Sequence, residues 1–323
     1  MILLTGSAGY IGSHISCILE QKKTKYLGID NLSKSSKENI LNKKNFIKAD
    51  YGDIKKINKI FTTKHISTVI HSAAFAYVLE GEKKKKIYFA NNVEKSKKFI
   101  DICIKKKVSN FIFLSSSNVY KDSNYKKTTN SQVKLKDIKN NYGRTKLLVE
   151  KYLISKKKNF QNLIILRLFN IAGYTNSFNY LEKKNENNLR IFPLIFNKIK
   201  KNKSLKIFIK KNNNKFIFPK RDYLHIKDFL FLIIKILKNL NKLNRKEIYN
   251  IGMGQNYSLN QIQTLISYNL KKKININYKK ISTKELISTL SDINKTKRHY
   301  KWKPKYSIND IVVSCMKNLI SKN

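Results

Sequence analysis

Cysteine, proline and glycine are scarce in this sequence of 323 residues, and each scarcity excludes a class of protein. The three cysteines, Cys17, Cys103 and Cys315, are far apart and form no Cys-x-x-Cys pair, so neither a disulfide framework nor a cysteine zinc site is expected. Only three prolines and ten glycines are present, which excludes a collagen-like or linker-rich chain. Because 41% of the residues are hydrophobic, the chain has enough apolar side chains for a sizeable core.

Long hydrophobic runs are absent as well. The longest candidate, residues 229–234, is interrupted by Lys235 and falls far short of the roughly 18 residues that a membrane-spanning helix needs. The first residues, MILLTG, predict a strand and a turn, and they lack the basic, apolar and cleavage segments of a secretory signal. Together with the unpaired cysteines, these absences favour a cytoplasmic protein without a membrane partner.

Acidic residues are few, and arginine is rarer still. Asp and Glu together number 20 against 68 Lys and Arg, which gives a net charge of +48. Lysine accounts for 62 of the 68 basic residues and is spread along the whole chain. Because arginine is preferred for bidentate contacts to phosphates and bases, its scarcity argues against a specific nucleic-acid partner. The charge is therefore interpreted as a solvated, lysine-rich surface.

Short apolar segments alternate with longer helix-compatible segments in the first half of the chain. This alternation predicts a parallel sheet with right-handed crossovers, a Rossmann-type doubly wound α/β fold. Strands are predicted at residues 1–4, 26–29, 46–49, 68–71, 111–114 and 163–168, and helices at 11–21, 54–61, 92–106 and 142–155.

Beyond residue 170 the alternation breaks. Helices are predicted near residues 192–200, 228–238 and 259–270, with a strand near 274–278. We therefore predict a nucleotide-binding domain at residues 1–170, joined by part of 221–250. A smaller, partly interleaved α/β substrate lobe is predicted to occupy mainly residues 171–323.

A glycine-rich loop, TGSAGYIG, follows the first predicted strand and opens the first helix. This context is typical of the fingerprint that binds a dinucleotide cofactor. Gly6 permits the tight turn, Gly9 lets the pyrophosphate approach the backbone at Tyr10 and Ile11, and Gly12 allows close packing of helix on sheet. Three small residues at such a junction can also serve packing alone, and it is the strand-loop-helix context that favours the cofactor.

Asp30 and Asn31 end the second predicted strand, 18 residues after the glycine loop. A carboxylate at this place accepts hydrogen bonds from both adenosine ribose hydroxyls and repels a 2′-phosphate, so it favours NAD over NADP. The alternative, a turn formed by the Asp-Asn pair, is locally plausible.

Tyr142 and Lys146 form a Tyr-x3-Lys motif on a predicted helix. Residues four apart share one helix face, so the phenol and the ammonium are expected in one site. A free phenol has a pKa near ~10, and a nearby ammonium lowers it toward the range of a useful base. Ser116, within a Ser-Ser-Ser run, ends the fifth predicted strand at the sheet edge where ligands bind in such folds. The motif alone is weak in a chain with so many lysines and with 18 tyrosines.

Motifs along nearly the whole chain resemble the extended short-chain dehydrogenase/reductases, and among them the UDP-glucose 4-epimerases most closely. The resemblance rests on TGSAGYIGSH, DNLSKSS, HSAAFAYV, NNV, SSSNVY, YGRTK, LRLFNIAG, KRDYLHIKD, YNIGMGQNYSL and WKP. It implies an NAD-dependent inversion at the sugar 4-position, no metal, and a homodimer formed by the helices at residues 92–106 and 142–155.

The resemblance also implies roles for individual residues. Tyr142 is the base and acid at the sugar 4-hydroxyl, Ser116 hydrogen-bonds the same oxygen, and Lys146 tunes Tyr142 and grips the cofactor. The remaining implied residues contact the cofactor (Asp50, Tyr51 and Asn91) or the UDP-sugar (Asn170, Phe208, Arg221 and Thr289).

Departures from the family pattern leave alternatives open. Ser282 stands where relatives carry an arginine for the diphosphate, so Lys279, Lys280 or Lys284 is expected to substitute. Asn118 replaces the carboxylate of nucleotide-sugar dehydratases, which argues against elimination of water. The alternative functions are those of a 4-epimerase of UDP-N-acetylglucosamine or UDP-glucuronate and of a non-catalytic binding protein.

Overall fold

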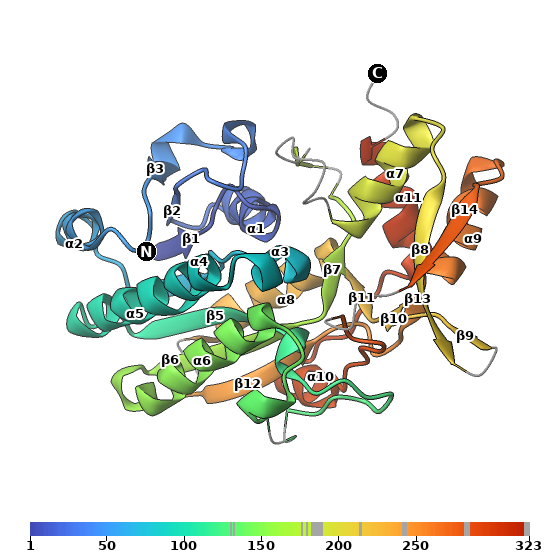
Figure 1. Ribbon diagram of the computed structural model, residues 1–323. Coiled ribbons are helices and arrows are strands. Elements are labelled where there is room, and N and C mark those ends of the chain that lie inside the picture. The colour runs from blue at the N-terminus through green and yellow to red at the C-terminus, as the bar shows by residue number, and fades with distance from the viewer. Residues whose placement is uncertain are drawn as a thin grey trace.

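The computed structural model describes residues 1–129, 131, 133–175, 177–178, 180–181, 190–212, 215–240, 244–280 and 285–319 (Figure 1). Within them, seven parallel strands form one sheet in the order β12-β6-β5-β4-β1-β2-β3. These strands are β1 (Ile2–Thr5), β2 (Tyr26–Asp30), β3 (Phe46–Lys48), β4 (Thr68–His71), β5 (Asn110–Ser116), β6 (Asn162–Leu168) and β12 (Lys246–Ile251). The order reverses between β1 and β4, as it does in doubly wound folds, and the predicted fold class is confirmed.

Helices cover both faces of this sheet because its strands are apolar on both faces. In β1, Leu3 belongs to a core cluster with Phe99 of α5, whereas Leu4 belongs to a second cluster with Ile15 of α1 and Phe229 of α8. The helices of this part are α1 (Tyr10–Gln21), α2 (Ile54–Thr63), α3 (Val78–Lys83), α4 (Lys85–Phe89), α5 (Lys95–Lys105), α6 (Asn141–Ser155), α8 (Ile226–Asn239) and α10 (Asn294–Tyr300).

A second group of elements lies beside this sheet, at the right of Figure 1. Its largest sheet has the order β14-β8-β9 among the described residues, and two-stranded pairs β7–β11 and β10–β13 connect it with the first part. The elements are β7 (Asn170–Ala172), α7 (Ile191–Lys200), β8 (Leu205–Asn212), β9 (Lys215–Ile217), β10 (Lys220–Arg221), β11 (Tyr223–His225), β13 (Tyr257–Ser258), α9 (Leu259–Leu270), β14 (Ile276–Lys280) and α11 (Ile308–Leu319). No helix in the described ranges is long and apolar enough to cross a membrane.

Polar side chains fix where several helices begin. The side-chain oxygen of Asn140 accepts the backbone N–H of Gly143 at 2.8 Å and caps α6, the helix that carries Tyr142 and Lys146. Ser258 and Gln261 form a reciprocal capping box at α9. Such caps satisfy N–H groups that the first turn of a helix leaves without partners.

The predicted helices and strands agree with the observed ones to within a few residues, with one difference in kind. The helix expected at residues 92–106 begins instead as a π-helical turn, η3 (Ala90–Glu94), and continues as α5. Several elements were not predicted individually, namely α3, α4, α10, α11, β7 to β11, β12 and β13. The segment KEIYNI is partly polar because β12 is the edge strand of the sheet. Five short 3-10 turns complete the description: η1 (Lys37–Asn39), η2 (Lys43–Asn45), η4 (Ser117–Val119), η5 (Leu135–Asp137) and η6 (Lys157–Asn159).

Candidate active site

The glycine loop leaves no room for side chains at two positions. Gly6 has a φ of +69°, and a Cβ there would lie 2.8 Å from the backbone of Ala73. A Cβ on Gly12 would lie 2.0 Å from the carbonyl oxygen of Gly6. The N–H of Gly9 donates to that same oxygen at 3.1 Å and closes the turn. These contacts agree with the tight turn and close packing predicted for Gly6 and Gly12. Gly9 and Tyr10, at the start of α1, line a cavity.

A cavity of about 440 Å³ opens at the carboxyl ends of β1, β2 and β4. Its volume is in the range of small-molecule and cofactor sites. All ten residues predicted to contact the cofactor outside the Tyr-x3-Lys motif line this cavity: Gly6, Gly9, Tyr10, Ile11, Gly12, Asp30, Asn31, Asp50, Tyr51 and Asn91. Asn170, predicted on the substrate side, lines it as well. The glycine cradle and this convergence fit a bound NAD.

Asp30 is almost fully buried at the end of β2. Its carboxylate accepts the N–H of Ala8 at 3.1 Å, the N–H of Leu32 at 2.8 Å and the hydroxyl of Ser35 at 2.8 Å. These bonds fix the carboxylate at the cavity wall, where a negative charge repels a 2′-phosphate.

We expect Asp30→Ala to narrow the preference for NAD over NADP, because it removes this charge. Dissociation constants of both cofactors check the prediction, with Asp30→Asn as the matched variant that removes the charge but keeps an oxygen for Leu32. Equal binding of NAD and NADP by the unmodified protein would contradict it.

Asp50 and Tyr51 lie at the same end of the cavity. Asp50 accepts hydrogen bonds from Lys95 at 2.7 Å and from Asn31 at 2.9 Å. Burial raises the pKa of Asp50, but these two bonds and that from the backbone of Gly52 outweigh burial and hold the pKa below its usual value. The hydroxyl of Tyr51 donates to the backbone carbonyl of Asn91.

Ser116, Tyr142 and Lys146 are all buried beside the carboxyl end of β5, outside the lining of the cavity. Burial raises the pKa of Tyr142 to about 12, and a hydrogen bond with Ser116 opposes this rise. Burial lowers the pKa of Lys146 to about 7, opposed by the charge of Glu150. The amine of Lys146 donates to the carbonyl oxygen of Leu114 at 2.7 Å. The hydrogen bond with Ser116 lowers the pKa of the phenol, and the expected effect of the Lys146 ammonium on Tyr142 stays a prediction.

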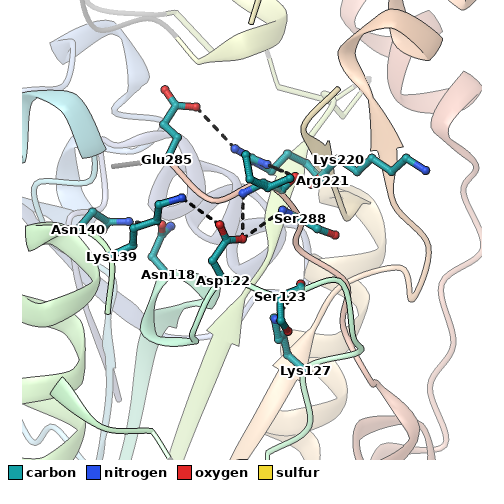
Figure 2. Close-up of polar contacts among 11 residues, drawn as sticks. Asn118, Asp122, Ser123, Lys127, Lys139, Asn140, Lys220, Arg221, Glu285 and Ser288 are labelled. Carbon is teal, nitrogen blue, oxygen red and sulfur yellow. Dashed lines mark hydrogen bonds and ion pairs between the residues drawn. The ribbon is translucent and has the colours of Figure 1, made fainter. Parts of the chain in front are cut away.

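The residues predicted to contact the UDP-sugar do not converge on one place as clearly as the ten cofactor residues do. Arg221 pairs with Glu285 at 3.6 Å and donates to the carbonyl oxygen of Lys220 at 3.1 Å (Figure 2). Thr289 is buried, and its hydroxyl accepts the N–H of Asp222 at 3.2 Å. Phe208 lies on β8, but its side chain is outside the described part of the structure, as are Ser282 and Lys284.

Two groups of polar residues were missed from the sequence. Asp222 is buried and accepts the N–H groups of Met253 at 2.6 Å, Gly254 at 3.1 Å and Ser291 at 3.0 Å, so it joins three segments around β10 and β12. Arg190 lines the cavity with its guanidinium carbon 3.2 Å from the ring centroid of Tyr10. Apart from the scarcity of arginine in this chain, nothing in the sequence indicated a role for Arg190.

Comparisons of the sequence and the fold with those of known proteins identify the family of this chain. The profile of the family described as "NAD dependent epimerase/dehydratase family" matches residues 2–252. A UDP-glucose 4-epimerase of Pasteurella multocida is 31% identical over 93% of this chain and 92% of its own, and one of Dictyostelium discoideum is 29% identical over 96% and 93%. The fold is similar to that of the UDP-glucose 4-epimerase of Bifidobacterium longum in complex with NAD+ and UDP, with a TM-score of 0.89, 22% identity and coverage of 99% and 98%.

Among the described residues, no group of His, Cys, Asp and Glu side chains is arranged to hold a metal ion. The matched profile spans the whole first sheet, including β12, and the relative from Pasteurella multocida covers both parts of the fold. The chain therefore belongs to the NAD-dependent epimerase/dehydratase family.

Proposed function

We propose that the protein is a UDP-glucose 4-epimerase, which interconverts UDP-galactose and UDP-glucose through a 4-keto sugar with tightly bound NAD. The observation that carries this proposal is the cavity at the carboxyl end of the sheet, where the ten cofactor residues converge next to buried Ser116, Tyr142 and Lys146. The curated relatives, up to 32% identical among those compared, share this activity.

The proposed roles follow from the chemistry of each side chain. Tyr142, as phenolate, accepts the proton of the sugar 4-hydroxyl and later returns it, while Ser116 hydrogen-bonds the same oxygen. Bound NAD supplies the hydride acceptor and donor. Because each face of the sugar must be presented in turn, the nucleotide provides most of the binding energy. We assign that binding to Asn170, Phe208 and Arg221, with Arg221 directed at the diphosphate.

The test is epimerisation by purified protein without added NAD. We expect UDP-galactose to be converted to UDP-glucose, and we expect near-stoichiometric NAD to be released when the protein is denatured. Both results follow from a cycle in which the hydride returns to the sugar. Turnover that requires excess free NAD would refute tight binding, and no conversion of any UDP-sugar would refute the function.

Thr289 favours a broader choice of sugar. The resemblance implies that relatives with a bulky tyrosine at this position reject sugars that carry a 2-acetamido group. Thr289 is far smaller than tyrosine. We expect the protein to accept UDP-N-acetylgalactosamine, with a kcat/KM that falls relative to UDP-galactose in Thr289→Tyr. Because Thr289 is buried, Thr289→Val serves as the control that keeps its size and removes only the hydroxyl. Rejection of the acetylated sugar by the unmodified protein would contradict this.

We also propose a cytoplasmic homodimer that pairs through α5 and α6, acts in galactose metabolism and has no specific nucleic-acid partner. The three cysteines are free thiols, which suits a reducing compartment. Light scattering over a range of salt concentrations tests the dimer, since lysines on both helices repel one another at low salt.

A further inference from the structure

Three hydrogen bonds connect the first turn of α6 with the hydroxyl of Ser116. The N–H of Gly143 donates to Oδ1 of Asn140 at 2.8 Å, Nδ2 of Asn140 donates to Oδ1 of Asn118 at 2.9 Å, and Nδ2 of Asn118 donates to Oγ of Ser116 at 3.2 Å. Asn140 is only 1% exposed, and Figure 2 shows it directed at Asn118. We call these residues the amide relay.

The direction of the amide relay is set at Gly143. A backbone N–H can only donate, so Asn140 must present its oxygen to Gly143 and its NH2 group to Asn118. Asn118 must then present its oxygen to Asn140 and its NH2 group to Ser116. Reversing either amide would place two donors or two acceptors face to face.

A second donor reaches the same hydroxyl. The backbone N–H of Asn118 also donates to Oγ of Ser116, at 3.2 Å. A serine hydroxyl has two lone pairs and one proton, so two donors occupy its accepting capacity. Ser116 is therefore left to act as a donor, and Tyr142 is the neighbour whose ionisation its hydrogen bond favours.

We propose that Asn118, held by Asn140, is a positioning residue that keeps the single proton of Ser116 available for donation, to Tyr142 or, in turn, to the sugar 4-oxygen. A donor at this place stabilises the phenolate, the form of Tyr142 that accepts the proton. It also stabilises the 4-oxygen as it becomes a carbonyl. This inference rests on the proposed epimerase function.

The relay is braced by a neighbouring ion pair. Lys139, the residue before Asn140, pairs with Asp122 at 2.9 Å. Asp122 also accepts the N–H groups of Ile287 at 2.9 Å and Ser288 at 3.3 Å (Figure 2). The segment that ends in Asn140 is thereby tied to the segment that leads to Thr289.

The first test variant is Asn118→Leu, which keeps the size of the side chain and removes its donor. We expect kcat/KM to fall about 10–100-fold and the acidic limb of its pH profile to move up by about one pH unit, because the phenolate loses the oriented hydroxyl of Ser116. The content of bound NAD should not change, since Asn118 does not line the cavity.

Two substitutions of Asn140 test the direction of the relay while keeping the cap on α6. Asn140→Ser is neutral and accepts the N–H of Gly143 but is too short to reach Asn118, so it should reproduce the shift without added charge. The carboxylate of Asn140→Asp cannot donate a hydrogen bond, so the amide of Asn118 should rotate and present its oxygen to Ser116. The proton of Ser116 then points away from Tyr142, and the acidic limb should move further than in Asn140→Ser. Asn42→Ser, at another capping asparagine, should leave the profile unchanged.

In Asn118→Leu and Asn140→Ser, the other ionisable groups around Tyr142 are unchanged. They are Lys146 on α6, Tyr88 on α4, and Glu80 and Glu82 on α3. A change in the Tyr142 titration therefore reports the hydroxyl of Ser116.

A readout without turnover separates this inference from the proposed function. The Tyr142 phenol is titrated by NMR in NAD-loaded protein with 13C-labelled tyrosine, using Tyr142→Phe for assignment. An unchanged limb and an unchanged Tyr142 titration in Asn118→Leu and Asn140→Ser would overturn the inference. An unmodified protein that epimerises no UDP-sugar, but whose Tyr142 titration moves in these variants, would refute the proposed function and support the relay.

Discussion

Tyr142→Phe is expected to bind NAD as the unmodified protein does and to epimerise UDP-galactose roughly 10²–10⁴-fold more slowly. The substitution removes one oxygen from a buried side chain and keeps its ring, so packing on α6 should be preserved. The lost oxygen is the one proposed to take and return the proton of the 4-hydroxyl. Bound NAD, measured after denaturation, and the initial rate of UDP-glucose formation check the two parts of the prediction.

The pKa of Tyr142 also predicts the direction in which kcat/KM changes with pH. Burial raises the pKa of Tyr142, so the reactive phenolate is the minor form at neutral pH and kcat/KM should rise with pH. Tyr142→Phe should lose this limb. The control is Tyr152→Phe, on the same helix, where the hydroxyl donates to exposed Asp101 and no effect on turnover is expected. Near-normal rates in Tyr142→Phe would show that another group moves the proton.

Local sequence patterns were sufficient to predict six of the seven strands of the sheet and the turn of the glycine loop. Apolar runs such as those of β5 and β6 indicate strands buried on both faces, and the spacing of Gly6, Gly9 and Gly12 indicates the turn into α1. Each of these signals lies within a dozen residues. Asp30 could be placed at the ligand-binding edge because it follows the second strand, whereas Asp50 was assigned only through the resemblance.

Long-range polar networks could not be predicted in this way. Tyr120 donates to Asn250, 130 residues further along the chain, at 2.7 Å, and no periodicity connects the two. The direction of the Lys146 amine was missed for a related reason. Helix spacing places Lys146 near Tyr142, but the nearest acceptor, the carbonyl of Leu114, is known only once β5 is packed against α6. The division of the chain at residue 170 stays a prediction.

The motif LRLFN illustrates a signal that was attributed to the family and has a structural cause. Arg167 on β6 forms a buried ion pair with Glu150 of α6 at 2.7 Å, with side-chain exposures of 5% and 0%. Its guanidinium also donates to the hydroxyl of Tyr120 at 3.0 Å, and Ser115 donates to the carboxylate of Glu150. The network fixes α6 against β5 and β6 beside Ser116.

Arg167→Met should lower the free energy of unfolding by about 3–5 kcal/mol, because it leaves the carboxylate of Glu150 buried without a counter-charge. Urea unfolding at saturating NAD measures the change, with NAD affinity checked so that cofactor binding does not account for it. Replacing both partners, Arg167→Met with Glu150→Leu, should recover most of the loss, since an apolar pair costs little in place of a buried ion pair. Lys295→Met, which breaks the more exposed pair with Glu247, should cost at most about 1 kcal/mol. If Arg167→Met costs no more than Lys295→Met, the buried network does not hold α6 in place, and the position of Tyr142 must depend on the Asn140 cap and on the apolar packing of α6 against β5.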